Sequence, residues 1–172
     1  MKIKIFFSFI IPAIILFLFF LGLKNSSQYN TQKLVGSRLT EIEINKFEDD
    51  SYLSFTKTFE KDFTLINFFA SWCGPCRKEH KFLLLLNKDK RINIVGINFK
   101  DKKDNAIKFL EELGNPYYML AKDTNGKTAV NFGVYGIPES LLINNNLTIV
   151  KKFIGPISEK DYQIILKLIS KK

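Results

Sequence analysis

The stretch FTLINFFASWCGPC, residues 63–76, joins a near-continuous apolar run to a pair of cysteines. Residues 63–70 are rich in Phe, Leu and Ile, which is typical of a strand buried on both faces of a sheet. Pro75 stands where the first turn of a helix accepts proline, and residues 77–87 continue as a helix with an apolar end. The cysteines therefore lie at a strand-to-helix junction.

Strands and helices alternate through the rest of the chain. The predicted elements are strand-like pieces at 39–47 and 52–59, strands at 63–70, 92–99 and 116–120, helices at 77–87 and 102–113, a turn with a short helix at 123–132, a hairpin of 139–144 with 147–153, and a helix that follows Ser158. Ser158 and Asp161 have the spacing of a capping box at the start of that last helix. This order predicts an α/β domain with a central mixed sheet flanked by helices.

The amino-terminal region has a different composition. Residues 5–23 contain no charge and match the length of about 20 residues that a transmembrane helix needs. A cleaved secretory signal would have a shorter apolar core and a small-residue cleavage site, so we favour an uncleaved anchor. We therefore expect a cytoplasmic N-terminus at 1–4, a transmembrane anchor at 5–23, a polar linker at 24–33 and one domain at 34–172.

The orientation of this anchor is not decided by charge. Lys2 and Lys4 favour an inside amino terminus, but Lys24, Lys33 and Arg38 come soon after the span. A single anchor behind so short a tail usually exports the domain on its carboxyl side, and we expect export here.

The net charge of +9 and the pI near 9.5 raise the question of a nucleic-acid partner. The lysines are spread along the chain and interleaved with acids, as in KDKKD at 100–104, without an arginine-rich patch. We interpret them as a solvated surface and expect no nucleic-acid partner, with loose attraction to an anionic membrane surface as the alternative.

Cys73 and Cys76 carry the predicted chemistry. Free N–H groups and the positive dipole end at a helix amino terminus stabilise an anion, so Cys73 is expected to form its thiolate at a lower pH than a free cysteine. Cys76, one turn further on, is placed to attack a mixed disulfide on Cys73 and release the partner. We assign Cys73 as the nucleophile and Cys76 as the resolving thiol. This redox-active disulfide, with no bound cofactor, is the expected reactive group.

Three other uses of the cysteines compete with redox exchange. A structural disulfide would close a very small loop and constrain the unfolded chain little. A zinc site needs four ligands, and beyond the two thiols the chain offers a single histidine, His80, and no second CxxC pair, so we expect no metal. Haem attachment would need His at position 77, where Arg77 stands. Redox exchange is favoured, and we expect His80 on the helix surface, outside the site.

Two further residues are informative. Trp72, the single tryptophan, directly precedes the nucleophile and is expected to form an apolar contact surface for partners, with a core position as the alternative. Pro138 opens a predicted strand although proline cannot donate to a ladder, so either a cis peptide bond or an ordinary trans turn after Gly136 is expected there.

These segments carry a family resemblance. FFASWCGPC followed about sixty residues later by GVYGIPE resembles the thioredoxin superfamily, over roughly residues 34–172. The combination of WCGPCRKEH, INFKD, LGNPY and GVYGIPE is similar to the DsbE/CcmG type of cytochrome c biogenesis protein.

The resemblance implies a thioredoxin-like fold, a cis Pro138 beside the dithiol, and Ile137 backbone groups that pair with a substrate strand. Glu79 and Glu139 match acidic positions near the family's active site. Glu79 lies one helical turn after Cys76, where it would tune the thiol pKa or carry protons; a glutamate on an exposed helix face is the competing interpretation.

The family keeps the cysteines of apocytochrome c reduced for haem attachment and receives electrons from a DsbD/CcdA-type membrane carrier. The resemblance therefore implies a single-pass protein of the inner membrane whose catalytic domain faces the periplasm. General thioredoxins carry a buried Asp six residues before the first cysteine, where this chain has Asn67, which favours the specialised exported branch. The competing hypotheses are an anchored reductase of other exported proteins and a non-catalytic structural or metal-holding protein.

Overall fold

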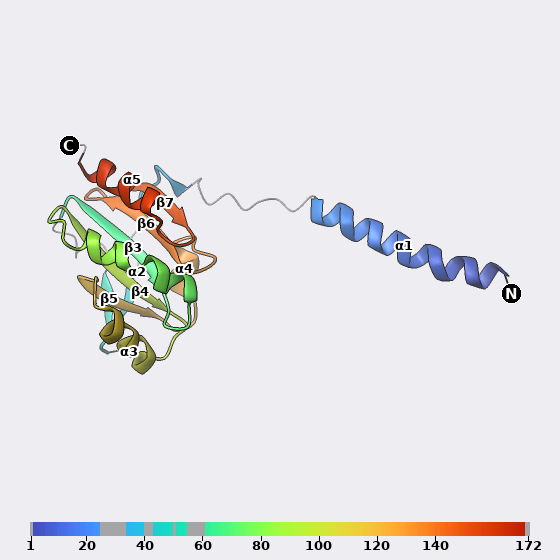
Figure 1. Ribbon diagram of the computed structural model, residues 1–172, viewed down its shortest axis with the longest axis horizontal. Helices are drawn as coiled ribbons and strands as arrows, with labels where there is room; N and C mark the ends of the chain where they lie inside the picture. The colour runs from blue at the N-terminus through green and yellow to red at the C-terminus, as the bar shows by residue number, and fades with distance from the viewer. Residues whose placement is uncertain (1, 25–33, 40–42, 50, 55–60, 171–172) are drawn as a thin grey trace. The chain divides into compact units, whose positions relative to one another are not determined.

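The computed structural model describes residues 2–24, 34–39, 43–49, 51–54 and 61–170 (Figure 1). The chain divides into two compact units, Met1–Asn30 and Thr31–Lys172. The first contains helix α1, Lys2–Lys24, with Pro12 inside it. None of the helices within the described residues has both the length and the apolar character needed to cross a membrane. The anchor at 5–23 stays a prediction, and the predicted linker falls at 25–33 outside the described residues.

Seven strands of the described part form one sheet in the order β2-β1-β5-β4-β3-β6-β7. They are β1 Glu43–Lys46, β2 Tyr52–Ser54, β3 Phe63–Phe69, β4 Ile92–Phe99, β5 Met119–Asp123, β6 Glu139–Asn144 and β7 Ile149–Ile154. The three central strands β3, β4 and β5 are parallel, and the outer strands pair antiparallel. The predicted central mixed sheet is confirmed. The parts of the first two predicted strands at 40–42 and 55–59 lie outside the described residues.

The sheet is packed on both faces. The helices of this unit are α2 Gly74–Leu86, α3 Lys103–Leu113, α4 Lys127–Asn131 and α5 Glu159–Ile169. On one face, Leu65 and Phe69 of β3 pack in a core with residues of α2, α3 and α5. On the other, Ile66 and Phe68 pack in a core that includes Ala129 of α4. This alternation follows from the period of two along a strand and explains why β3 is apolar throughout.

Local signals set several boundaries as predicted. Ser158 caps α5 through a capping box with Asp161. Gly114, with φ of 88°, ends α3 in a backbone conformation that suits glycine. The strand predicted at 116–120 begins instead at Met119, because the Asn115 side chain accepts the Tyr117 N–H at 2.9 Å and holds the preceding segment in a turn.

Candidate active site

The dithiol lies at the amino end of α2, directly after β3, one of the three central strands. Cys73 is the N-cap residue, and its Sγ accepts a hydrogen bond from the Cys76 N–H at 3.1 Å. The two cysteines form a disulfide with their Cα atoms 5.3 Å apart, and both are buried. Free N–H groups at a helix amino terminus stabilise an anion, and the Cys76 N–H points at Cys73 Sγ. The role of Cys73 as the nucleophile stays a prediction.

Asp101 holds the turn that directly precedes Cys73. The Asp101 carboxylate accepts the Ser71 N–H at 2.6 Å and the Ser71 hydroxyl at 2.9 Å. Asn98 donates to the same carboxylate at 3.1 Å. The loop after β4 thus holds the residues just before the nucleophile. Sequence reasoning did not find this role for Asp101, although it lies in the INFKD segment.

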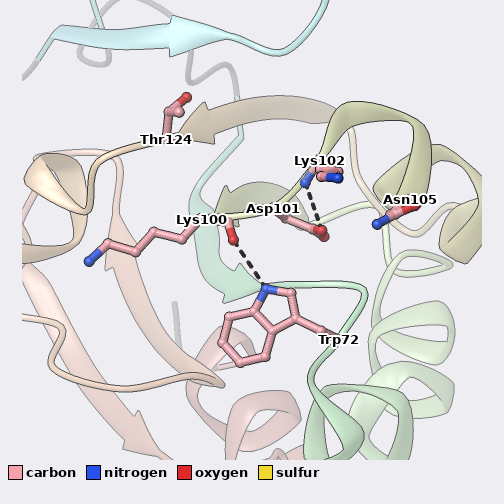
Figure 2. A pocket seen from close by; sticks show the side chains of 6 residues that line it. All are labelled: Trp72, Lys100, Asp101, Lys102, Asn105 and Thr124. Atoms are coloured by element: carbon pink, nitrogen blue, oxygen red, sulfur yellow. Dashed lines mark hydrogen bonds between the residues drawn. The ribbon is translucent and has the colours of Figure 1, made fainter.

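Trp72 is exposed beside the nucleophile, with 60% of its surface accessible. Its indole N–H donates to the Lys100 carbonyl at 3.1 Å, which fixes the ring orientation (Figure 2). The ring lines a pocket of about 460 Å³ with Lys100, Asp101, Lys102, Asn105 and Thr124. An exposed, immobilised aromatic side chain is suited to partner contact. Its role in substrate binding stays a prediction.

Glu79 is buried, with 1% of its surface exposed, and the interpretation as a surface glutamate is wrong. One carboxylate oxygen accepts from Asn67 Nδ2 at 2.8 Å and the other accepts the Ile157 N–H at 2.7 Å. Burial raises the pKa of Glu79 from 4.5 to about 7, and these two hydrogen bonds oppose part of the rise. Glu79 lies three residues after Cys76 on one helix face. Its predicted role in tuning the thiol pKa or carrying protons stays a prediction.

Asn67 organises the groups around Glu79. Its side-chain amide donates to Glu79 and, at 3.0 Å, to the Ser140 hydroxyl. Its carbonyl oxygen accepts from the Tyr117 hydroxyl at 2.8 Å. Burial, with the Glu79 charge as a smaller cause, raises the pKa of Tyr117 well above 10.0, so this hydroxyl stays a donor. The sequence showed the absence of an acid at position 67. The structure shows that Asn67 instead anchors an acid supplied by α2.

His80 is buried, so the prediction that it lies on the surface of the helix is wrong. Only 2% of its surface is exposed, and its Nε2 lies 2.8 Å from the Gly114 carbonyl. A carbonyl oxygen only accepts, so Nε2 carries the proton. The ring stands edge-on to Phe109 at 5.1 Å between ring centroids. Burial lowers the pKa of His80, which links α2 to α3 as a neutral side chain.

The Ile137–Pro138 peptide bond is cis, as the resemblance implies. In the sheet register, Glu139 opposes Phe68, so this junction lies at the end of β3 that leads to the dithiol. The half-buried Ile137 packs against the core cluster that contains Cys73 and Cys76. The register thus brings two distant segments to the same end of the sheet. Their role in binding a substrate strand stays a prediction.

A metal site is the alternative use of the cysteines that the structure allows us to examine. Among the residues that the structure describes, no three side chains of His, Cys, Asp or Glu are grouped as a metal ion would require.

A thioredoxin-like sheet with a Cys-Gly-Pro-Cys disulfide on the first helix after its central strand corresponds to the class of thiol–disulfide oxidoreductases. The chain belongs to the Redoxin family, which matches residues 34–166. It is 34% identical over 145 residues to the thiol:disulfide interchange protein DsbE of Vibrio cholerae, covering 82% of this chain and 78% of that protein.

One further relative and one solved structure of the same fold extend the comparison. The thiol:disulfide interchange protein CycY of Rhizobium leguminosarum bv. viciae is 59% identical over 93 residues, but the match spans only 54% of this chain and 50% of CycY. A solved structure, a putative DsbE from Chlorobium tepidum, has the same fold with a TM-score of 0.66 and 24% identity, covering 78% of this chain and 94% of that chain. The resemblance to DsbE-type proteins is confirmed.

Proposed function

We propose that this protein is a membrane-anchored reductase of disulfides in exported proteins, and that the cysteines of apocytochrome c are its principal substrate. The observation that carries the proposal is the position of Cys73 Sγ at the N-cap of α2, where it accepts the Cys76 N–H. That position favours the thiolate, which is the form that attacks a disulfide.

The reaction is a two-step exchange. The Cys73 thiolate attacks one sulfur of the client disulfide, forms a mixed disulfide and releases the other client sulfur as a thiolate. Cys76 then loses its proton and attacks Cys73, which releases the second client thiol and leaves the Cys73–Cys76 disulfide. Two electrons pass from the protein to the client. A dithiol carrier of the DsbD/CcdA type returns two electrons to the pair.

Glu79 is suited to the second step. Its carboxyl group is buried one turn beyond Cys76, and its raised pKa of about 7 lets it accept the Cys76 proton at neutral pH. Asn67 and the Ile157 N–H hold its two oxygens in place.

The proposed location is the inner membrane, with a single span at residues 5–23 and the catalytic domain in the periplasm. The uncharged run and the similarity to DsbE support it. A membrane-impermeant maleimide should label the reduced dithiol in cells whose outer membrane has been permeabilised. Labelling that appears only after the inner membrane is lysed would contradict the periplasmic orientation.

The client is tested with Cys76→Ser, which removes the resolving thiol and leaves partners linked to Cys73. We expect disulfide-linked complexes with a c-type apocytochrome and with the membrane carrier. The Cys73→Ser/Cys76→Ser double variant is the matched control and should trap nothing. Complexes with other exported proteins alone would support the broader reductase, and the absence of any complex would contradict the exchange reaction.

A further inference from the structure

Lys152 and Glu139 form an ion pair inside the domain that the exchange chemistry does not use. The Lys152 side chain has 0% of its surface exposed and the Glu139 side chain 7%, and their Nζ and Oε2 atoms are 2.7 Å apart. Ser140, which contacts Asn67, points to the opposite face of β6 from Glu139. The pair therefore lies across the sheet from Glu79. Removing two charges from water is costly, so their other contacts are informative.

Those contacts converge on one loop. Lys152 Nζ also donates to the Gly133 carbonyl at 2.5 Å. Glu139 Oε1 accepts the Tyr135 N–H at 3.3 Å and the Gly136 N–H at 3.2 Å. The pair thus holds both ends of residues 133–136, the segment that leads directly into Ile137 and Pro138. Charge-assisted hydrogen bonds of this kind are stronger than neutral ones.

The outer side of the same loop is apolar. Tyr135 has 58% of its surface exposed, and Lys152 Nζ lies 5.9 Å from the centroid of its ring. Ile154, which opposes Glu139 in the sheet register, is 63% exposed. The charges are thus buried beneath a backbone segment whose exposed side chains suit an extended polypeptide with apolar residues.

We propose that Glu139 and Lys152 are positioning residues that hold residues 133–137 in the conformation that receives an extended segment of the client. This rests on the proposed function, in which the client is a protein and not a small thiol. The pair does not act on the sulfur atoms. Its loss should therefore weaken client binding and leave the intrinsic reactivity of the dithiol intact.

The test compares two substrates of the full-length protein, a disulfide-bonded peptide and the small disulfide 5,5′-dithiobis(2-nitrobenzoate). In Glu139→Leu/Lys152→Met, both charges are replaced by apolar groups of similar size, a change that buried pairs often tolerate. We expect KM for the peptide to rise about tenfold, with kcat and the rate with the small disulfide unchanged. Lys152→Arg should keep KM near the wild-type value.

Lys151→Met is the matched control, because it removes one positive charge from the same strand at a half-buried position. Its KM should equal that of the wild type. An unchanged KM in the folded double variant would overturn the proposal. If the double variant does not fold, Glu139→Gln takes its place, with KM expected to rise about threefold because neutral acceptors bind amides more weakly; an unchanged KM there also overturns the proposal. A wild-type protein that shows no preference for the peptide over the small disulfide would instead count against a protein client.

Discussion

Substitution of Glu79 by Gln should abolish a pH dependence of stability that the buried carboxyl creates. Because the pKa is about 7 in the folded protein and 4.5 in the unfolded chain, the folded state holds a proton that the unfolded state has lost between these values. The free energy of unfolding therefore falls as pH rises from about 4.5, and most of this loss is complete somewhat above pH 7. At about 1.4 kcal/mol for each pKa unit, the loss is about 3 kcal/mol.

Urea unfolding of the oxidised protein at several pH values from 4 to 8 measures this effect. The free energy of unfolding of Glu79→Gln minus that of the wild type should increase by about 3 kcal/mol from pH 4 to pH 8. The Gln side chain has one acceptor where Glu79 uses two, so a constant offset from a lost hydrogen bond is expected and does not affect the slope. Glu111→Gln, on an exposed position of α3, should behave as the wild type does. A difference between Glu79→Gln and wild type that does not change with pH would refute the reasoning.

Three other substitutions test neighbouring parts of the site, each by urea unfolding. Asn67→Asp replaces the amide 2.8 Å from Glu79 by a second carboxyl, so it should cost about 2 kcal/mol, and more at pH 8 than at pH 5. Burial lowers the pKa of His80 from 6.5, so the His80 contribution to stability should decline as pH falls through 6.5, opposite in sign to that of Glu79, and the free energy of unfolding of His80→Gln minus that of the wild type should increase as pH falls. Gly96→Ala places a methyl carbon 2.7 Å from the Tyr117 ring and should cost about 1–3 kcal/mol at all pH values. Equal stability of the variant and the wild type would contradict each prediction.

The sequence predicted those parts of the fold that local patterns control. The apolar runs at 63–70 and 92–99 became the central strands, and Ser158 with Asp161 capped the last helix. The start of β5 was displaced because a side chain, Asn115, captured a backbone N–H that a strand would have used. A side chain that competes with a neighbouring strand for a backbone N–H leaves no mark on the hydrophobic periodicity of the sequence.

The dithiol was also predictable from the sequence, whereas the burial of the polar side chains Glu79 and His80 on the same helix was not. Glu79 and His80 are buried, and they form hydrogen bonds with backbone groups of Ile157 and Gly114, which are distant in the sequence. A signal was present, because position 79 has helical spacing with the buried Cys76 and Leu83. A charged residue in an apolar stripe breaks the local pattern, and such breaks mark functional positions.

Lys152 was missed for a different reason. It comes directly after Lys151, so successive lysines on β7 point to opposite faces of the sheet. Nothing in the sequence distinguishes the lysine that faces Glu139 from the one that faces away, because the partner lies on another strand. Only the register between β6 and β7 makes the distinction.

The assignment of Cys73 as the activated nucleophile is tested most directly by alkylation. The reduced protein is treated with iodoacetamide at a series of pH values, and the modified cysteine is identified by mass spectrometry, with the urea-unfolded chain as the control. Cys73 should react first, with a midpoint at least one unit below the value of about 8.5 for a free cysteine. A midpoint at about 8.5, or preferential modification of Cys76, would contradict the account.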